Sequence, residues 1–135
     1  MWYNFLKIRE GVKEVMKGVF VEYPKCSTCR NAKKWLDNNN VEYVDRNIVI
    51  ETPTYEELKE WIGRSDKNIK SFFNTSGLVY KSLNLKEKLP KISDDEKIRL
   101  LSRNGMLIKR PLFISDDGIL IGFKQDEWKE KLGGK

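Results

Sequence analysis

The sequence predicts an α/β domain in which a small mixed sheet is interrupted by an inserted helical bundle. Three observations predict this class: a strand–helix–strand pattern opens the chain, amphipathic helical segments fill its middle, and two short strands and a helix close it. One helix between two strands favours a parallel pair, whereas a tight hairpin requires an antiparallel one. The order βαβ, inserted helices, ββα is that of a thioredoxin-like fold.

The first half of this fold is expected over residues 19–47. A β-type run over Val19–Tyr23 opens it, and a second run over Val41–Asn47 closes it. Between them, Cys26–Asn39 has the spacing of an amphipathic helix. The run Asn38–Asn40 supplies residues that tolerate the left-handed backbone at a helix end. The cysteines should therefore lie where the first strand turns into the helix.

The middle of the chain is expected to be helical because two capping boxes precede apolar periodic runs. Thr54–Glu57 starts a helix that Gly63 should end, and Ser93–Glu96 starts one that Asn104-Gly105 should stop. A shorter helical pattern covers Ile69–Phe73.

The last part of the chain returns to strands. Leu112–Ile114 and Ile119–Ile121 flank Asp116-Asp117-Gly118, a hairpin sequence. Trp128 and Leu132 then mark a final helix.

Composition indicates one soluble domain. The chain has 135 residues, 39% of them hydrophobic and 34% charged. It contains no apolar run of the roughly 20 residues that a membrane span needs and no signal-peptide pattern, so we expect a cytoplasmic protein without membrane contact. The net charge of +6 could favour acidic partners, but the basic residues alternate with acids, which is typical of a solvated surface. Direct binding to nucleic acid is not expected.

Residues 1–17 look unlike the rest, and we separate them from a domain over 18–135. Trp2, Phe5 and Leu6 have near-helical spacing, which favours an added helix. The alternative is that Met16 is the natural start of the protein.

The segment Pro24–Arg30 carries the clearest chemistry. A cysteine thiolate is the reactive form, and the start of a helix stabilises its charge through free N–H groups and the helix dipole. Cys26 is expected there, with Lys25 and Arg30 adding positive potential. Cys29 lies one helical turn on, where it can resolve a mixed disulfide on Cys26.

Two other interpretations of the cysteines stay open. One is half of a zinc site, which would need carboxylates as its other ligands because the chain has no histidine and no further cysteine. The other is a pair of inert buried thiols. We expect no metal site.

Two further segments could contribute to a site. Lys109-Arg110-Pro111 precedes the hairpin, and its proline is a candidate for a cis peptide bond that presents a backbone edge to a thiol substrate. Arg110 could hold an oxyanion or the Cys26 thiolate, although a solvated arginine beside an edge proline is an equally ordinary arrangement. The loop Asn74–Gly77 follows two aromatic residues and could line a site or be purely structural.

At these segments the chain resembles the arsenate reductase family of glutaredoxin-coupled type, which includes the Spx-type regulators. The resemblance runs from about Val19 to Leu132 and rests on four segments: Tyr23–Arg30, Phe72–Gly77, Gly105–Leu112 and Ile121–Lys124. It implies a thioredoxin-like fold with an inserted helical bundle, a nucleophile at Cys26 and an anion-facing Arg110. The candidate catalytic residues are therefore Cys26, Cys29 and Arg110, and the candidate substrate- or anion-binding residues are Lys25, Ser27, Thr28, Arg30, Asn74 and Pro111.

The chain also departs from the family's pattern. The reductases carry two further oxyanion-binding arginines, and the matching positions here are Asn74 and Phe123. A second cysteine at the position of Cys29 is typical of the Spx-like branch, but those regulators have a longer basic tail after the last strand. The chain looks most like the uncharacterised arsenate reductase-like group.

Two functions follow as hypotheses. The first is a thiol–disulfide oxidoreductase with no bound cofactor, a poor arsenate reductase, restored by glutathione or by a thioredoxin- or glutaredoxin-type partner. The alternative is an Spx-like redox-sensing regulator that binds RNA polymerase.

Overall fold

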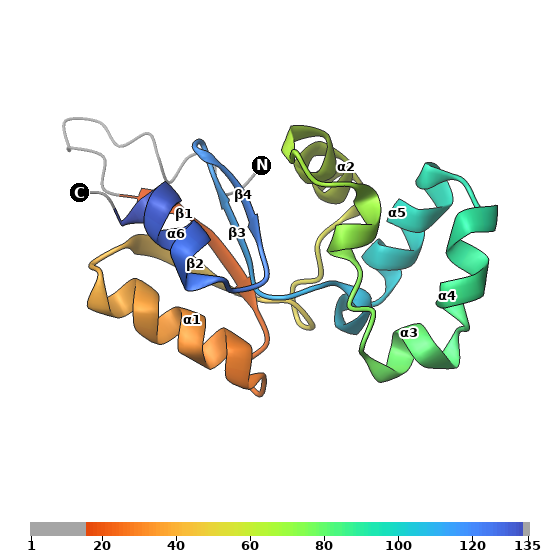
Figure 1. Ribbon diagram of the computed structural model, residues 1–135, viewed down its shortest axis with the longest axis horizontal. Coiled ribbons are helices and arrows are strands. Elements are labelled where there is room, and N and C mark those ends of the chain that lie inside the picture. The colour runs from red at the N-terminus through yellow and green to blue at the C-terminus, as the bar shows by residue number, and fades with distance from the viewer. Residues whose placement is uncertain (1–15, 134–135) are drawn as a thin grey trace. The chain divides into compact units, whose positions relative to one another are not determined.

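The computed structural model describes residues 16–133 and divides them into two compact units (Figure 1). The first unit holds residues 16–46 and 110–133, and the second holds Asn47–Lys109. The predicted helix in residues 1–15 lies outside the described part of the chain. The expected helical insertion is thus a compact unit of its own, and each unit is described separately below.

The first unit has the thioredoxin-like arrangement that the sequence predicts. Its elements are β1 (Met16–Glu22), α1 (Ser27–Asn38), β2 (Glu42–Asn47), β3 (Leu112–Ser115), β4 (Gly118–Ile121) and α6 (Gln125–Leu132). The strands form one sheet in the order β2-β1-β3-β4. Strand β3 is antiparallel to both β1 and β4, and the single helix between β1 and β2 makes a βαβ crossover, so the sheet is mixed.

One face of this sheet is covered by α1 and α6. Phe20, Phe113 and Leu120 follow one another across β1, β3 and β4, and they belong to one buried cluster with residues of both helices. Trp128 of α6 is fully buried in this cluster, and its indole N–H donates a hydrogen bond of 2.9 Å to the carbonyl oxygen of Gly122. This packing fixes α1 on the sheet and with it the cysteines at its start.

The second unit is helical. Its helices are α2 (Tyr55–Arg64), α3 (Leu78–Ser82), α4 (Leu85–Lys88) and α5 (Asp94–Arg103), with short 3-10 turns at Ile69–Phe72, Leu89–Lys91 and Gly105–Leu107. Helix α2 packs against α5. The predicted capping box at the start of α2 is confirmed, because the Thr54 hydroxyl accepts from the Glu57 N–H and the Glu57 carboxylate accepts from the Thr54 N–H. At the start of α5 the Ser93 hydroxyl accepts from the Glu96 N–H, which is one half of the predicted box.

Two element boundaries differ from the sequence prediction, and two short helices were not predicted. Helix α2 continues through Gly63 to Arg64, because Ser65, rather than the glycine, closes the helix with its N–H on the carbonyls of Trp61 and Ile62. Helices α3 and α4 were not predicted. They have five and four residues, too few for an apolar period to show. Strand β1 runs over Met16–Glu22, so it begins three residues before the predicted run Val19–Tyr23 and ends one residue before its end.

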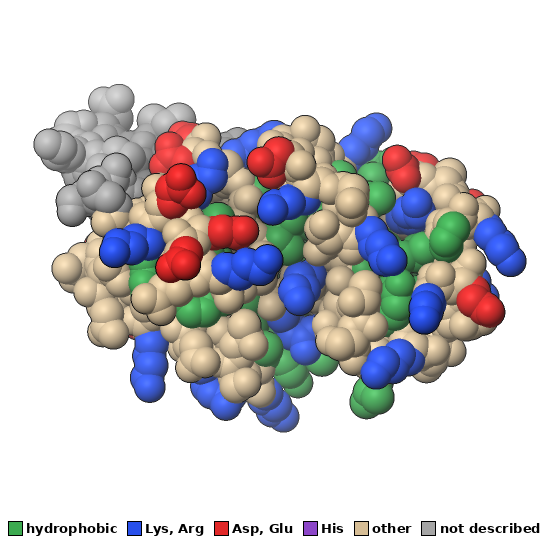
Figure 2. All heavy atoms as spheres, in the orientation of Figure 1, with side chains coloured by type: hydrophobic (Ala, Val, Ile, Leu, Met, Phe, Trp, Pro, Cys, Tyr) green, Lys and Arg blue, Asp and Glu red, His purple; other side chains and the backbone are tan. Residues whose placement is uncertain are grey.

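Other local predictions are confirmed. Asn40 has a positive φ of 57° just after α1, as the asparagine run suggested. The hairpin between β3 and β4 turns at Asp116-Asp117. On the face in Figure 2, basic and acidic side chains are interspersed over the upper part, whereas the charged side chains along the lower edge are all Lys or Arg. Within residues 16–133, no helix is long and apolar enough to cross a membrane.

Candidate active site

Cys26 caps the N-terminus of α1. Its backbone is extended, with φ −92° and ψ 123°, and its carbonyl oxygen accepts the first bond of the helix from the Arg30 N–H at 3.0 Å. The Cys26 N–H is held by the carbonyl of Tyr23, also at 3.0 Å. The chain therefore turns sharply from β1 into α1, and the thiol sits at the positive end of the helix dipole, partly exposed.

The pKa of the Cys26 thiol is lowered from its ordinary value. Partial burial raises this pKa, but hydrogen bonds from the backbone and side chain of Cys29, the positive charge of Arg110 and the backbone of Thr28 together outweigh burial. Each of these favours the thiolate. Cys26 has the electrostatic surroundings of a reactive cysteine.

Cys29 has the opposite character. Its side chain is fully buried, and burial raises the pKa of its thiol to about 12. The backbone N–H of Tyr23 donates to its sulfur at 3.5 Å and partly opposes this rise, while the neighbouring charges of Cys26 and Glu22 add to it. Both cysteines are free thiols, and their side chains lie within hydrogen-bonding reach of each other.

Arg110 lies immediately before β3 and is the cation that favours the Cys26 thiolate. Its guanidinium carbon is 5.5 Å from the centre of the Tyr23 ring, which places it beside the turn that carries Cys26. The peptide bond to Pro111 is cis, as predicted, and Pro111 is buried. The structure thus brings together the two cysteines and Arg110.

The other predicted residues near the cysteines are at the surface. Lys25, Ser27, Thr28 and Arg30 are all exposed. The Arg30 guanidinium donates to the Pro24 carbonyl at 3.2 Å and so braces the turn. Among nearby cations it is Arg110, not Lys25 or Arg30, that contributes most to lowering the Cys26 pKa.

The two positions that depart from the reductase pattern have different surroundings. Asn74 belongs to the helical unit, where its backbone N–H donates to the Leu107 carbonyl at 2.8 Å and its side-chain oxygen accepts from the Ser76 hydroxyl at 3.5 Å. Phe123 belongs to the first unit, and its ring packs edge-on against Trp128 with centroids 5.1 Å apart. The aromatic ring at position 123 is therefore part of the packing around α6.

One group near the cysteines was missed by the sequence analysis. Glu22 ends β1 and is only 5% exposed. Burial, together with a hydrogen bond and like charge from Asp45, raises the pKa of Glu22 to about 7. Asp45 itself is paired with Lys33 at 2.8 Å. The one indication in the sequence is an acid that directly follows the apolar run Val19–Val21.

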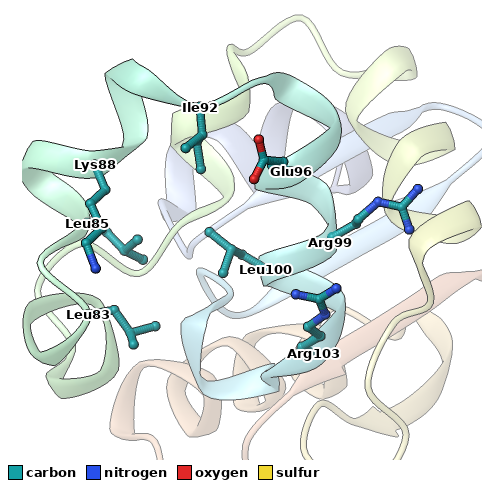
Figure 3. A pocket seen from close by; sticks show the side chains of 8 residues that line it. All are labelled: Leu83, Leu85, Lys88, Ile92, Glu96, Arg99, Leu100 and Arg103. Carbon is teal, nitrogen blue, oxygen red and sulfur yellow. The ribbon is translucent and has the colours of Figure 1, made fainter.

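The helical unit carries a pocket of its own (Figure 3). It is lined by apolar and charged side chains of the segment from α3 to α5: Leu83, Leu85, Lys88, Ile92, Glu96, Arg99, Leu100 and Arg103. The lining has no cysteine, so no thiol chemistry belongs to it. In the described part of the chain, no group of three His, Cys, Asp or Glu residues could hold a metal ion.

The fold and the site define a thioredoxin-like protein with a thiol pair at the start of its first helix. The family comparison agrees with this class, since residues 21–131 match the ArsC family. The chain therefore belongs to the ArsC family.

Similar proteins bear different names. The uncharacterized protein YusI of Bacillus subtilis is 48% identical over 115 residues, which cover 85% of this chain and 98% of that protein. The regulatory protein MgsR of the same organism is 32% identical over 108 residues, which cover 80% of this chain and 84% of MgsR. Among solved structures, the crystal structure of a putative ArsC family related protein from Bacteroides fragilis matches with a TM-score of 0.83. The two sequences are 53% identical, and the match covers 87% of this chain and 98% of that one.

Proposed function

We propose that this protein is a cytoplasmic thiol–disulfide oxidoreductase in which Cys26 is the nucleophile and Cys29 the resolving thiol. The observation that carries the proposal is the contrast between the two thiols. Cys26 is partly exposed and has a lowered pKa, whereas Cys29 is buried and has a raised one. A nucleophile must be a thiolate that a substrate can reach, and a resolving thiol need only reach its partner.

The reaction begins when the Cys26 thiolate attacks one sulfur of a substrate disulfide. A Cys26–substrate disulfide forms, and the other substrate sulfur leaves with the electron pair and takes up a proton. Cys29 then loses its proton and attacks the Cys26 sulfur, which releases the second substrate thiolate and leaves a Cys26–Cys29 disulfide. The substrate is reduced by two electrons and the cysteine pair is oxidised by two.

Arg110 supports the first step, because its positive charge favours the Cys26 thiolate. Two equivalents of glutathione, or a dithiol partner of thioredoxin or glutaredoxin type, would restore the cysteines and become oxidised in turn. Lys25, Ser27, Thr28 and Arg30 are exposed neighbours of Cys26 in the chain and would contact the substrate. We assign Pro111, the neighbour of Arg110 in the chain, to substrate binding on the same hypothesis.

Trapping of the mixed disulfide tests this function. In Cys29→Ser, the resolving thiol is gone, so a substrate or partner should stay bound to Cys26 and be released by dithiothreitol. Cys26→Ser is the matched control and should trap nothing. If Cys26→Ser traps partners through Cys29 as efficiently as Cys29→Ser traps them through Cys26, Cys26 is not the nucleophile and Cys29 is not the resolving thiol.

A redox-sensing regulator is the second candidate, and the similarity to the regulatory protein MgsR over 80% of this chain supports it. On this hypothesis, oxidation of the cysteine pair would change the affinity for RNA polymerase. Binding of the purified chain to the polymerase of its own organism should then differ between the oxidised and reduced forms. Equal or absent binding in both forms would argue against this function.

A further inference from the structure

The pocket of the helical unit has an apolar interior that is only partly covered. Its volume is about 240 Å³, and it is formed by α4, α5 and the segments that precede each of them (Figure 3). Leu85 in this pocket is buried, but Leu83 is 39% exposed, and Ile92 and Leu100 are only partly buried. Four aliphatic side chains gathered in one open hollow differ from the single apolar residues that are scattered over an ordinary protein surface.

The size of the pocket fits one large apolar side chain. A protein cavity of about 150 Å³ holds a benzene molecule, whereas pockets for drug-sized ligands start at about 300 Å³. The volume of this pocket lies between these two. In protein interfaces, the side chains that carry most of the binding energy are often large and fill desolvated pockets of the partner. The pocket therefore has the dimensions of an anchor site for a side chain of another protein.

The positive charges around the pocket are not all neutralised by neighbouring acids. Arg99 is engaged elsewhere, because its Nε donates to Asp95 at 2.9 Å and its guanidinium carbon lies 4.8 Å from the centre of the Tyr55 ring. Lys88 and Arg103 are exposed, and neither forms an ion pair within residues 16–133. These two cations are therefore available to an anionic partner.

The charges of the pocket differ between its two ends. Glu96 is in the first turn of α5 and Arg103 is in the last, so their backbones are about 10 Å apart along the helix. In Figure 3, Glu96 lies at the end of the pocket with Ile92, and Arg103 lies at the end with Leu83. A negative charge on a partner would be repelled by Glu96 and attracted by Arg103. The pocket thus favours one orientation of a partner that carries acidic side chains.

A second hollow in the helical unit extends the positive charge. It has a volume of about 400 Å³ and shares Leu85 with the first, so the two adjoin. Lys81 and Lys86 line it, both are exposed, and in the described part of the chain neither is ion-paired. Glu87, the nearest acid in the chain, accepts a hydrogen bond from the Asn84 amide at 3.0 Å. The second hollow is therefore suited to acidic groups that follow an apolar anchor.

We propose that the α3–α5 face, the surface that lines these two hollows, docks an acidic segment of a partner protein. The segment inserts one leucine or aromatic side chain among Leu83, Leu85 and Leu100, and its carboxylates lie beside Arg103, Lys88 and the lysines of the second hollow. Complementary charge at an interface favours an acidic partner over a second copy of this chain, whose net charge is +6. Neither hollow is lined by a cysteine, so the docking is independent of the thiol chemistry.

Nuclear magnetic resonance of the isotope-labelled full chain tests the proposal with a defined probe. The probe is a short acetylated peptide in which one phenylalanine is flanked by glutamates. At peptide concentrations up to about 1 mM, we expect saturable shifts of backbone amide signals that are confined to residues 75–103. Because a single anchor side chain supplies the apolar contact, the Kd should be on the order of 0.1–1 mM.

Two matched peptides separate the apolar from the electrostatic contribution. One has alanine in place of phenylalanine and keeps the charge, and the other has lysines in place of the glutamates and keeps the ring. Each should bind at least about tenfold more weakly than the acidic phenylalanine peptide.

Variants of the chain locate the site. Arg103→Glu should raise the Kd of the acidic peptide at least about fivefold, and Leu83→Ser at least about threefold. Lys129→Glu makes the same kind of charge change at an exposed lysine of α6 in the first unit, so it is the matched control and should leave the Kd unchanged. The amide signals of each free variant report whether it is folded. If a variant does not fold, the three peptides on the natural chain still test the proposal.

Four results would overturn the proposal. The acidic peptide at about 1 mM does not shift the signals of residues 75–103, or the lysine peptide binds as tightly as the acidic one. Phenylacetate, which has one ring and one carboxylate, binds as tightly as the peptide, which would identify a site for a small molecule. The same signals shift with the concentration of the chain alone, which would identify a second copy as the occupant.

Discussion

The guanidinium carbon of Arg110 lies 5.5 Å from the centre of the Tyr23 ring. Tyr23 is also the residue whose backbone N–H donates to the Cys29 sulfur at 3.5 Å and whose carbonyl holds the Cys26 N–H at 3.0 Å. One residue therefore contacts the three groups assigned to catalysis. Its backbone positions the two thiols, and its ring supports the cation that favours the Cys26 thiolate.

Removal of that cation should make Cys26 less reactive. The charge of Arg110 lowers the pKa of Cys26, so Arg110→Met should raise it and leave less thiolate at pH 7. Alkylation of Cys26 by iodoacetamide should slow several-fold at pH 7, and the difference should disappear at a pH where both proteins are fully ionised. Arg110→Lys should slow the alkylation of Cys26 less than Arg110→Met does, because it keeps the positive charge. Arg30→Met is the control for loss of an exposed arginine. A rate unchanged in Arg110→Met would contradict the electrostatic role.

The two thiols should differ strongly in labelling. Cys26 is partly exposed with a lowered pKa, whereas Cys29 is fully buried with a pKa raised to about 12. Iodoacetamide at pH 7 should therefore modify Cys26 well before Cys29 in the folded protein, and denaturant should remove the difference. Peptide mapping by mass spectrometry measures both sites at once. Equal rates in the folded state, or faster labelling of Cys29, would reverse the assignment.

Mild peroxide should convert the pair into an internal disulfide. The thiolate of Cys26 is oxidised first to a sulfenic acid, and Cys29 lies within reach to condense with it and release water. The protein should lose two thiols and two hydrogen atoms in mass. In Cys29→Ser, the same treatment should instead carry Cys26 on to sulfinic acid. Sulfinic acid as the main product in the natural chain would show that Cys29 does not condense with the sulfenic acid on Cys26.

Arsenate should be a poor substrate. The reductases that the chain resembles carry arginines where this chain has Asn74 and Phe123, and each charged hydrogen bond to an anion is worth roughly 1.5–3 kcal/mol. The Phe123 ring packs against Trp128, so an arginine there would also disturb the core. In a glutathione- and glutaredoxin-coupled assay beside an authentic family reductase, we expect efficiency at least about a hundredfold lower. Turnover within about tenfold of that reductase would show that other groups replace the missing arginines.

The buried carboxyl group of Glu22 should make the stability of the folded protein depend on pH. Its pKa is raised from 4.5 to about 7 on folding, so the folded state keeps a proton that the unfolded state has lost between these values. Stability from Glu22 is therefore complete below pH 4.5 and is lost as the pH rises to about 7, with a slope of at most about 1.4 kcal/mol per pH unit.

Urea unfolding of the reduced protein at pH 5 and pH 7.5 measures this effect. The natural chain should lose about 2 kcal/mol more between the two pH values than Glu22→Gln does. Comparison with the variant removes the contributions of the other carboxyl groups. If the two proteins have parallel pH profiles, Glu22 does not hold its proton in the folded state.

The parts of the fold that follow from neighbouring residues were predictable. The N-terminal caps of α2 and α5 each use a hydroxyl and the N–H three residues on, so a short pattern contains the whole interaction. The position of Cys26 at the start of α1 follows in the same way from a strand, a proline and an amphipathic run. Local pattern could therefore place the nucleophile.

The surroundings of that nucleophile depend on residues far apart in the chain. Glu22 looks like an ordinary strand-end acid until α1 and β2 are packed around it, and only then do burial and Asp45 change its chemistry. Arg110 was a candidate on sequence grounds, but its place beside Tyr23 comes from the pairing of β1 with β3. Contacts made by tertiary packing leave no periodic trace in the sequence.

The division of the chain into units has a consequence for its synthesis. The helical unit is one continuous stretch, Asn47–Lys109, whereas the thiol-bearing unit is assembled from two segments on either side of it. A ribosome therefore completes every residue of the helical unit before it makes β3, β4 and α6. Until Trp128 emerges to close the core over Phe20, the strand and helix that carry both cysteines remain part of an unfinished sheet. Both cysteines are therefore synthesised before Arg110, the cation that lowers the pKa of Cys26.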